Sequence, residues 1–344
     1  MNTSFGITCR RAVVVGLFAS VATLCPSGGQ AGDEPAGVFA LRNQNPFLQI
    51  YGLPTFQTAV LVDKERSAWG LSLDLANHAD FGDTDIENFV VDGETYFLTL
   101  SMRRRVADWL EVGVDLPLVS HADGFMDNMI EGWHDFFGMS NTKRQGPANE
   151  LGFLYQLNGE DLYRLESSAS GIGDIQLTAA IPLGNASRRQ AAISLRSSVK
   201  LPSGDTVKLL GSGAVDASIA VHIGSTGILL DRDLGLNGFA GLLVLGDGDV
   251  LPNLHRETVG FGGMAAAWHL HERFTAIAQL SAQSSYYKSD VEELGGSSLQ
   301  LAVGGNYTAR GGTSLRLAVV EDVSANATTD FAVHFSVRTR GGEH

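Results

Sequence analysis

The sequence predicts an all-β fold, namely a transmembrane antiparallel up-and-down β-barrel of about 12 strands, with one short amphipathic helix in a long extracellular loop. Three observations support this prediction. From Leu110 onward, stretches of roughly ten to thirteen residues alternate apolar and polar side chains. The N-terminus has the composition of an export signal, and no uncharged apolar run long enough for a spanning helix follows it. The connections between the predicted strands are alternately short and long.

The alternation is clearest in residues 191–201. Apolar side chains occupy nearly all of one face, whereas Arg196 and Lys200 lie among small residues on the other. The pattern recurs at 110–116 and 174–181. A soluble sandwich would also alternate, but its strands are usually shorter, and a membrane strand needs about 9 to 11 residues to cross. Length and repetition therefore favour a barrel with lipid outside and polar groups inside.

The first 31 residues are typical of a Sec signal peptide. Arg10 and Arg11 precede the apolar run 12–24, and Gly29 and Ala31 supply the small residues of a cleavage site. We therefore expect residues 1–31 to be removed. Both cysteines, Cys9 and Cys25, lie in this segment. The mature chain would then have no disulfide, cysteine-bound metal or thiol nucleophile. Lipidation at Cys25 is disfavoured because the preceding Leu24 is bulky.

Composition limits the partners. The chain has 24 Lys and Arg against 38 Asp and Glu, a formal net charge of −14. An acidic surface disfavours nucleic acid, which attracts basic proteins. It suits acidic loops that cations bridge to lipopolysaccharide. The expected location is the bacterial outer membrane, and the expected partners are outer-membrane lipid and lipopolysaccharide, the barrel-assembly machinery and an unknown small solute.

The predicted strands follow in order along the chain. They are residues 66–78, 93–105, 108–119, 171–183, 188–201, 213–224, 236–246, 257–269, 273–286, 296–308, 312–321 and 329–339. Short connections, as at 106–107 and 309–311, should face the periplasm, and long ones should lie outside. The connection at 225–235 is predicted to lie on the periplasmic side, but it is longer than the other turns expected there. Trp109, Trp268, Phe274 and Tyr307 would form a periplasmic aromatic girdle, although large aromatics also flank ordinary hairpins.

The mature chain divides into an arm and a barrel. Residues 32–65 are predicted to form a periplasmic or plugging arm, and residues 66–344 the barrel, which includes the long loop 121–170. In this loop, apolar residues recur at helical spacing on one face and acidic residues lie mainly on the other. The residues of this predicted loop helix, 125–137, include Phe125, Met129, Ile130, Trp133, His134, Phe136 and Phe137. It either braces the barrel or serves as a constriction or lid.

A family resemblance rests on this helix and on two further segments. The run from Gly124 to Asp127, followed by 130–138 (IEGWHDFFG), resembles the hallmark of a bacterial family called domain of unknown function three-one-eight-seven. The arm segments 42–47 and 52–54 and the hairpin 109–118 are similar to that family too. The resemblance implies an outer-membrane barrel and supplies no activity. One departure is the polar C-terminal tail, where such barrels often end on an aromatic residue.

Charged residues in the predicted strands should face the lumen, because Arg or Lys facing mid-membrane lipid costs about 2 to 4 kcal/mol. Two interpretations are open: a closed, salt-bridged interior, slightly favoured by the mixed signs, or a narrow aqueous path that selects solutes. About twelve strands lie between filled eight-stranded barrels and open porins, so the count decides neither. The predicted lumen residues are Asp74, Arg103, Glu111, Asp115, Asp174, Arg196, Lys200, Asp216, His222, Arg316, His334 and Arg338.

Motifs for chemistry are weak. His269, His271 and Glu272 could chelate a metal, but they occupy a tight hairpin with no third ligand nearby in sequence, which favours a solvated turn. Ser197 and Lys200 share the spacing of a catalytic dyad, yet their strand positions place them on opposite faces. No catalytic residue, metal or cofactor is predicted.

The main functional hypothesis is a channel or transporter for a small solute, with the loop helix as constriction or lid. The alternative is a non-conducting structural or interaction barrel that presents its long loop to lipopolysaccharide or a partner protein. An outer-membrane lipid hydrolase is a third, weaker hypothesis, because it would need a Ser and His pair facing lipid.

Overall fold

The computed structural model describes residues 37–64, 66–123, 151–184, 192–225, 234–323, 327 and 331–340. The expected signal peptide, the predicted loop helix 125–137 and both cysteines lie outside these ranges. In the described part of the chain, no helix has the length and apolar character needed to cross a membrane.

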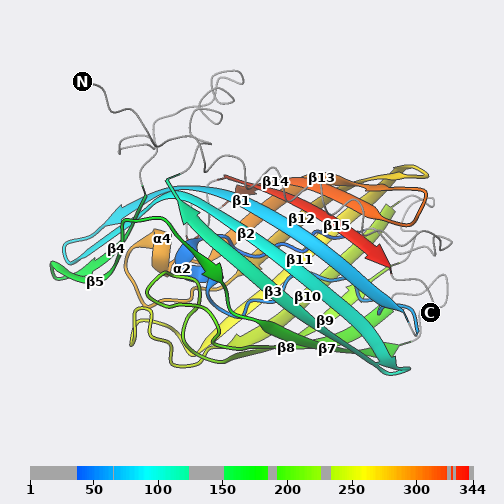
Figure 1. Cartoon of the computed structure of the whole chain (residues 1–344), viewed down its shortest axis with the longest axis horizontal. Helices are drawn as coiled ribbons and strands as arrows, with labels where there is room; N and C mark the ends of the chain where they lie inside the picture. The colour runs from blue at the N-terminus through cyan, green and yellow to red at the C-terminus, as the bar shows by residue number, and fades with distance from the viewer. Residues whose placement is uncertain are drawn as a thin grey trace, which may run out of the picture.

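Twelve antiparallel strands close into a barrel, as the sequence predicted (Figure 1). Closure follows because β1 pairs with both β2 and β15. The barrel strands are β1 (Ser67–Asp83), β2 (Glu87–Ala107), β3 (Leu110–Ala122), β7 (Gln176–Gly184), β8 (Ala192–Lys200), β9 (Asp216–Gly224), β10 (Leu234–Val244), β11 (Thr258–His271), β12 (Phe274–Gln283), β13 (Ser298–Thr308), β14 (Ser314–Asp322) and β15 (Phe331–Arg340). The short β6 (Ala169–Ile172) pairs with residues 118–121 of β3, and β7 pairs with residues 111–115 of the same strand.

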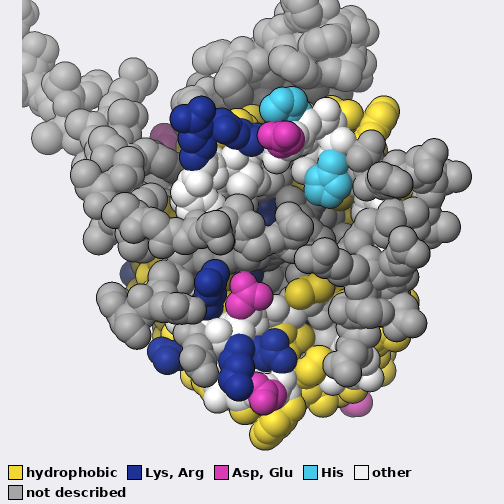
Figure 2. Space-filling model, turned by 90° about the vertical axis from the view of Figure 1, so that its right-hand side faces the viewer, with side chains coloured by type: hydrophobic (Ala, Val, Ile, Leu, Met, Phe, Trp, Pro, Cys, Tyr) yellow, Lys and Arg dark blue, Asp and Glu magenta, His cyan; other side chains and the backbone are white. Residues whose placement is uncertain are grey.

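The two ends of the barrel differ. We call the end that carries the connections β2–β3, β11–β12 and β13–β14 the turn end; β1 begins there and β15 finishes there. The opposite end, with the connections β8–β9, β10–β11 and β12–β13, is the loop end. Basic side chains gather on the turn end, which faces the viewer in Figure 2. The exposed Trp109, Trp268, Phe274 and Tyr307 also lie there.

The faces of each strand follow the alternation in the sequence. In β8, Ser194, Ser198 and Lys200 are buried inside, while Val199 is exposed on the outside. Large apolar side chains are exposed around the outer wall, as an integral membrane barrel requires. Examples are Leu100, Leu116, Leu177, Ile219, Val221, Leu242, Met264, Val303, Leu317 and Val319.

The first hairpin is longer than predicted. Residues 79–92 were expected to connect two strands, but β1 continues to Asp83 and β2 starts at Glu87. The extension of β2 pairs with β4 (Gly152–Leu157), which pairs with β5 (Glu160–Leu165). These strands project beyond the loop end in Figure 1. Their buried side chains, including Phe89 and Phe153, explain why this acidic segment is a strand rather than a loop.

The arm, defined here as residues 37–64, lies inside the barrel. It ascends from the turn end, where Gly37 lies beside Ala267, to the short helix α2 (Pro46–Gln49) near the loop end. Asn45 caps this helix, because its side chain accepts a hydrogen bond from the Phe47 N–H at 3.0 Å. The chain then descends to the turn end and enters β1. Figure 1 shows the arm as the blue trace within the barrel.

Three apolar clusters include residues of the arm, and one of them holds Val38 and Phe56 against Ala265. Around the ascending limb, the wall presents small side chains that leave room for Phe39 and Leu41, namely Ala76, Ala267, Ala302, Ala318 and Ala332. At the loop end, α2 contributes Phe47 and Leu48 to a larger core with Phe89, Phe153 and Tyr287. The helix α4 (Glu292–Gly295) adds Leu294 to it. Full burial of each large side chain stabilises this arrangement by about 1.5–3 kcal/mol.

Candidate functional site: the lumen and its arm

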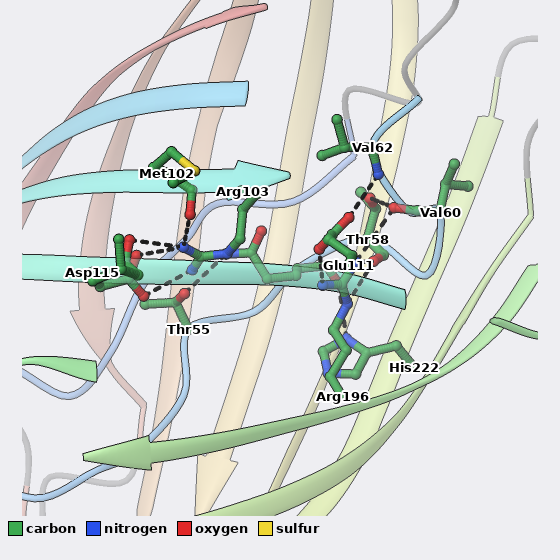
Figure 3. A network of polar contacts seen from close by, with 12 residues as sticks. Thr55, Thr58, Val60, Val62, Met102, Arg103, Glu111, Asp115, Arg196 and His222 are labelled. Atoms are coloured by element: carbon green, nitrogen blue, oxygen red, sulfur yellow. Dashed lines mark hydrogen bonds and ion pairs between the residues drawn. The ribbon is translucent and has the colours of Figure 1, made fainter. Parts of the chain in front are cut away.

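The descending limb of the arm is held by a charged pair on the wall, drawn in Figure 3. Arg196 Nη1 of β8 lies 2.8 Å from Glu111 Oε1 of β3. The same guanidinium donates to the carbonyl of Thr58 at 3.0 and 3.2 Å. Glu111 Oε2 accepts the N–H of Val62 at 2.6 Å. Each charged group therefore binds its partner on the wall and the main chain of the arm at once.

A second pair lies next to it in Figure 3. Arg103 binds Asp115 through two parallel hydrogen bonds of 2.8 Å each, and both side chains are buried. Arg103 Nη1 also donates to the carbonyls of Met102 and Val114, at 3.1 and 3.2 Å. This two-pronged geometry is the strong form of an arginine–carboxylate pair, and it joins β2 to β3 inside the barrel.

A lysine between two carboxylates anchors the arm near the loop end. Lys200 Nζ lies 2.5 Å from Asp174 Oδ2 and 3.3 Å from Asp216 Oδ2, and all three side chains are buried. Asp216 Oδ2 accepts the N–H of Gly52 at 2.8 Å. Gln176 donates to the carbonyl of the same glycine at 3.0 Å. One residue of the arm thus has both of its main-chain polar groups satisfied by the wall.

The ascending limb is held in the same way. Arg316 donates to the carbonyl of Val38 at 3.1 Å. The side-chain amide of Gln279 accepts the N–H of Phe39 at 2.8 Å and donates to its carbonyl at 3.2 Å. Nearby, His334 Nδ1 lies 2.7 Å from Asp74 Oδ1, in a pair that joins β15 to β1.

Arg42 belongs to the ascending limb and points to the wall. Its guanidinium lies over the ring of Phe97, 4.8 Å from the ring centre. Near the loop end, Tyr51 Oη donates to Tyr287 Oη at 2.9 Å, and burial raises the pKa of both phenols.

The structure places the predicted lumen residues as follows. Ten are buried, Arg196 retains 13% side-chain exposure, and Arg338 is partly exposed and lines a cavity of about 60 Å³. The buried ten are Asp74, Arg103, Glu111, Asp115, Asp174, Lys200, Asp216, His222, Arg316 and His334. Other cavities in the lumen hold about 10 to 30 Å³. On this measure a cavity needs only about 10–15 Å³ to hold one water, so these cavities have room for one to a few waters each.

Several polar residues of this site were not identified from the sequence. Gln176 and Gln279 are uncharged and did not stand out. The buried His78 and His121 lie on either side of Thr95, 3.0 Å from its hydroxyl on each side. These three residues occupy inward-facing positions on β1, β2 and β3. That strand register was the signal that could have identified this chain of hydrogen bonds.

The histidines of the β11–β12 turn lie away from the lumen cluster. His269 Nδ1 is 2.9 Å from the Thr275 hydroxyl, and His271 and Glu272 are exposed. Among the described residues, no group of three or more histidine, cysteine or acidic side chains could hold a metal ion.

A closed twelve-stranded wall with apolar side chains outside and ion pairs inside defines an integral β-barrel protein of the bacterial outer membrane. The chain belongs to the family described as Protein of unknown function (DUF3187), whose model matches residues 15–340. The resemblance seen in the sequence is thereby confirmed.

A solved outer-membrane channel shows the same fold, and further solved structures are similar at lower scores. The COG4313 outer membrane channel from Pseudomonas putida F1 is similar with a TM-score of 0.54 at 10% identity, over 81% of this chain and 97% of that chain. The NanC porin has a TM-score of 0.44 at 7% identity, over 81% and 100% of the two chains. The P. putida toluene transporter TodX has 0.39 at 10% identity, over 81% and 89%. No curated protein matches the chain in sequence.

Proposed function

We propose that this protein is an outer-membrane channel or transporter for a small solute, and that its own N-terminal arm closes the lumen. The observation that carries the proposal is the route of the arm. It occupies the interior from the turn end to the loop end and back, and its side chains and main chain contact strands on opposite sides of the barrel.

The way the arm is held suits a gate. The strand ladder closes without it, because β1 pairs with β15 directly. Side chains of the wall, rather than strand pairing, hold most of its length. A typical protein hydrogen bond contributes only about 0.5–1.5 kcal/mol net. These hydrogen bonds can break one at a time while the barrel keeps its ladder, and full release of the arm also exposes buried side chains such as Phe39 and Phe47.

The predicted loop helix 125–137 keeps its proposed role as a second constriction or lid, and it lies outside the described residues. The sequence left two options for residues 32–65, a periplasmic arm or a plugging arm, and the proposal adopts the plugging arm. In the proposal the arm accounts for closure of the lumen, and the helix would act at its loop-end mouth.

A reversible crosslink tests the gate. A Cβ built on Gly224 would lie 3.8 Å from the Cβ of Ala59 in the descending limb, which is the usual separation across a disulfide. The double variant Ala59→Cys/Gly224→Cys should therefore form a disulfide once the side chain of Asn237 moves aside. In planar bilayers we expect discrete conductance steps under reducing conditions and their loss on oxidation. The single variant Ala59→Cys should conduct equally in both conditions.

The alternative of a non-conducting barrel has one observation in its favour, the apolar core that covers the loop end around α2. It predicts silence from the double variant in both redox states. Equal conductance in both states would instead mean that a path exists beside the arm, and the arm would not be the gate.

A further inference from the structure

The lumen wall recognises the arm chiefly through its main chain. Most polar wall side chains that reach the arm bind a peptide N–H or carbonyl of it. The wall residues concerned are Arg316 at Val38, Gln279 at Phe39, Asp216 and Gln176 at Gly52, His222 at Gln57, Arg196 at Thr58 and Val60, and Glu111 at Val62. Such contacts depend little on which side chains the bound segment carries.

At two positions the wall satisfies both polar groups of one peptide residue. Gln279 binds the N–H and the carbonyl of Phe39 with a single side-chain amide, as a neighbouring strand would. At Gly52, the acceptor is Asp216 and the donor is Gln176. All three wall side chains are buried. Without a peptide in the open lumen, these groups would exchange their peptide partners for water and lose about 0.5–1.5 kcal/mol of net stabilisation per hydrogen bond.

Two features add selectivity for side chains. Gly52 occupies a tight position, because a Cβ there would lie 3.0 Å from the Cβ atoms of Asp216 and Lys200, which would have to give way slightly. Four residues later, the ring of Phe56 packs 4.2 Å, centre to centre, from that of Phe239 and 6.1 Å from that of His222. The wall therefore offers a narrow point and then an aromatic pocket.

We propose that the lumen wall is a binding site for extended peptides and that the arm is its built-in occupant. The inference rests on the proposed gate and names the class of solute that would replace the arm. Main-chain hydrogen bonds with occasional side-chain pockets are the usual means of binding an extended peptide. The descending limb from Gly52 to Val62 contains no helix and bends at residues 59–60, and its length suggests an occupant of about ten residues.

Competition with the arm tests this inference in the full-length protein. Ala59 is 3% exposed, so the thiol of an Ala59→Cys variant should react slowly with a polar maleimide while the arm is in place. A peptide with the sequence of residues 51–63 should speed this labelling in a saturable way. The tethered arm has an effective concentration on the order of millimolar, so the peptide is titrated into that range.

Three further probes separate the explanations. A peptide that keeps the glycine and the phenylalanine but exchanges the other residues should compete within about threefold of the first, because the main chain carries the affinity. The first peptide N-methylated at the amides equivalent to Gly52 and Val62 should need at least about tenfold more, because two buried acceptors lose their donors. A linear maltooligosaccharide of similar length should not compete.

Each outcome has a defined meaning. Equal competition by the N-methylated peptide or by the oligosaccharide would overturn the inference. Competition by the peptide of residues 51–63 without competition by the peptide with exchanged residues would overturn it too. No effect from any probe would also overturn it. In that case the Ala59→Cys/Gly224→Cys variant still tests the gate separately, because reduction of its disulfide releases the arm whatever the solute is.

Discussion

Asp216 accepts the main-chain N–H of Gly52 at 2.8 Å, so a carboxylate on β9 holds a residue that lies 164 positions earlier in the chain. The other oxygen of Asp216 accepts the N–H of Gly246 at 3.0 Å. The same side chain therefore joins the arm to the loop that follows β10. Lys200, 3.3 Å away, supplies the opposite charge.

Replacement of Gly52 by valine should loosen the arm. The new Cβ would meet the Cβ atoms of Asp216 and Lys200, which neighbouring strands hold in place, so the arm must move. We expect a loss of about 1–3 kcal/mol in unfolding free energy measured in detergent, and a higher probability of the open channel in bilayers. Gly152→Val is the matched control, because nothing lies within 4 Å of a Cβ built there. Equal loss in both variants would mean that glycine-to-valine strain, not the contact, is responsible.

Removal of the buried ammonium should be severe. In Lys200→Met, Asp174 and Asp216 remain buried without their counter-charge, and loss of one partner from a buried pair typically costs about 3–5 kcal/mol. Lys208 also pairs with an aspartate, Asp205, at 3.4 Å, but both side chains are about half exposed. Lys208→Met should therefore cost no more than about 1 kcal/mol. Denaturation in detergent measures both, and similar values would show that the lysine–carboxylate cluster does not stabilise the fold.

The barrel wall could be predicted from the sequence because the necessary information is local. Residues two apart on a strand share a face, so the alternation in β8 alone separated Val199 from Lys200. Tight turns between alternating stretches then fixed which strands pair. The end of β1 was missed because Asp80, Asp83 and Asp85 are typical of a loop, and the partners that bury this segment lie far along the chain.

The path of the arm could not be predicted in this way. Residues 37–64 have no period that assigns a face, and many of their hydrogen bonds connect residues far apart in the chain, by 138 positions at Thr58 and 278 at Val38. The small wall side chains that admit the arm, such as Ala302 and Ala318, look like ordinary strand residues until the lumen is closed. The ion pairs were recognised as inward-facing, but their second role of binding the arm depends on this path.

The outer wall allows lipid contact to be distinguished from mere exposure. Leu317 on β14 is 56% exposed and Val207 in the loop after β8 is 76% exposed, so a new side chain has space at both positions. Only Leu317 lies in the middle of a spanning strand. Leu317→Arg should therefore cost about 2–4 kcal/mol and reduce the folded fraction that resists unfolding in unheated gels, because it places a charge against lipid. Val207→Arg should leave assembly unchanged. If both variants assembled equally well, the apolar belt around Leu317 would face water, and the placement of this wall in a membrane would be wrong.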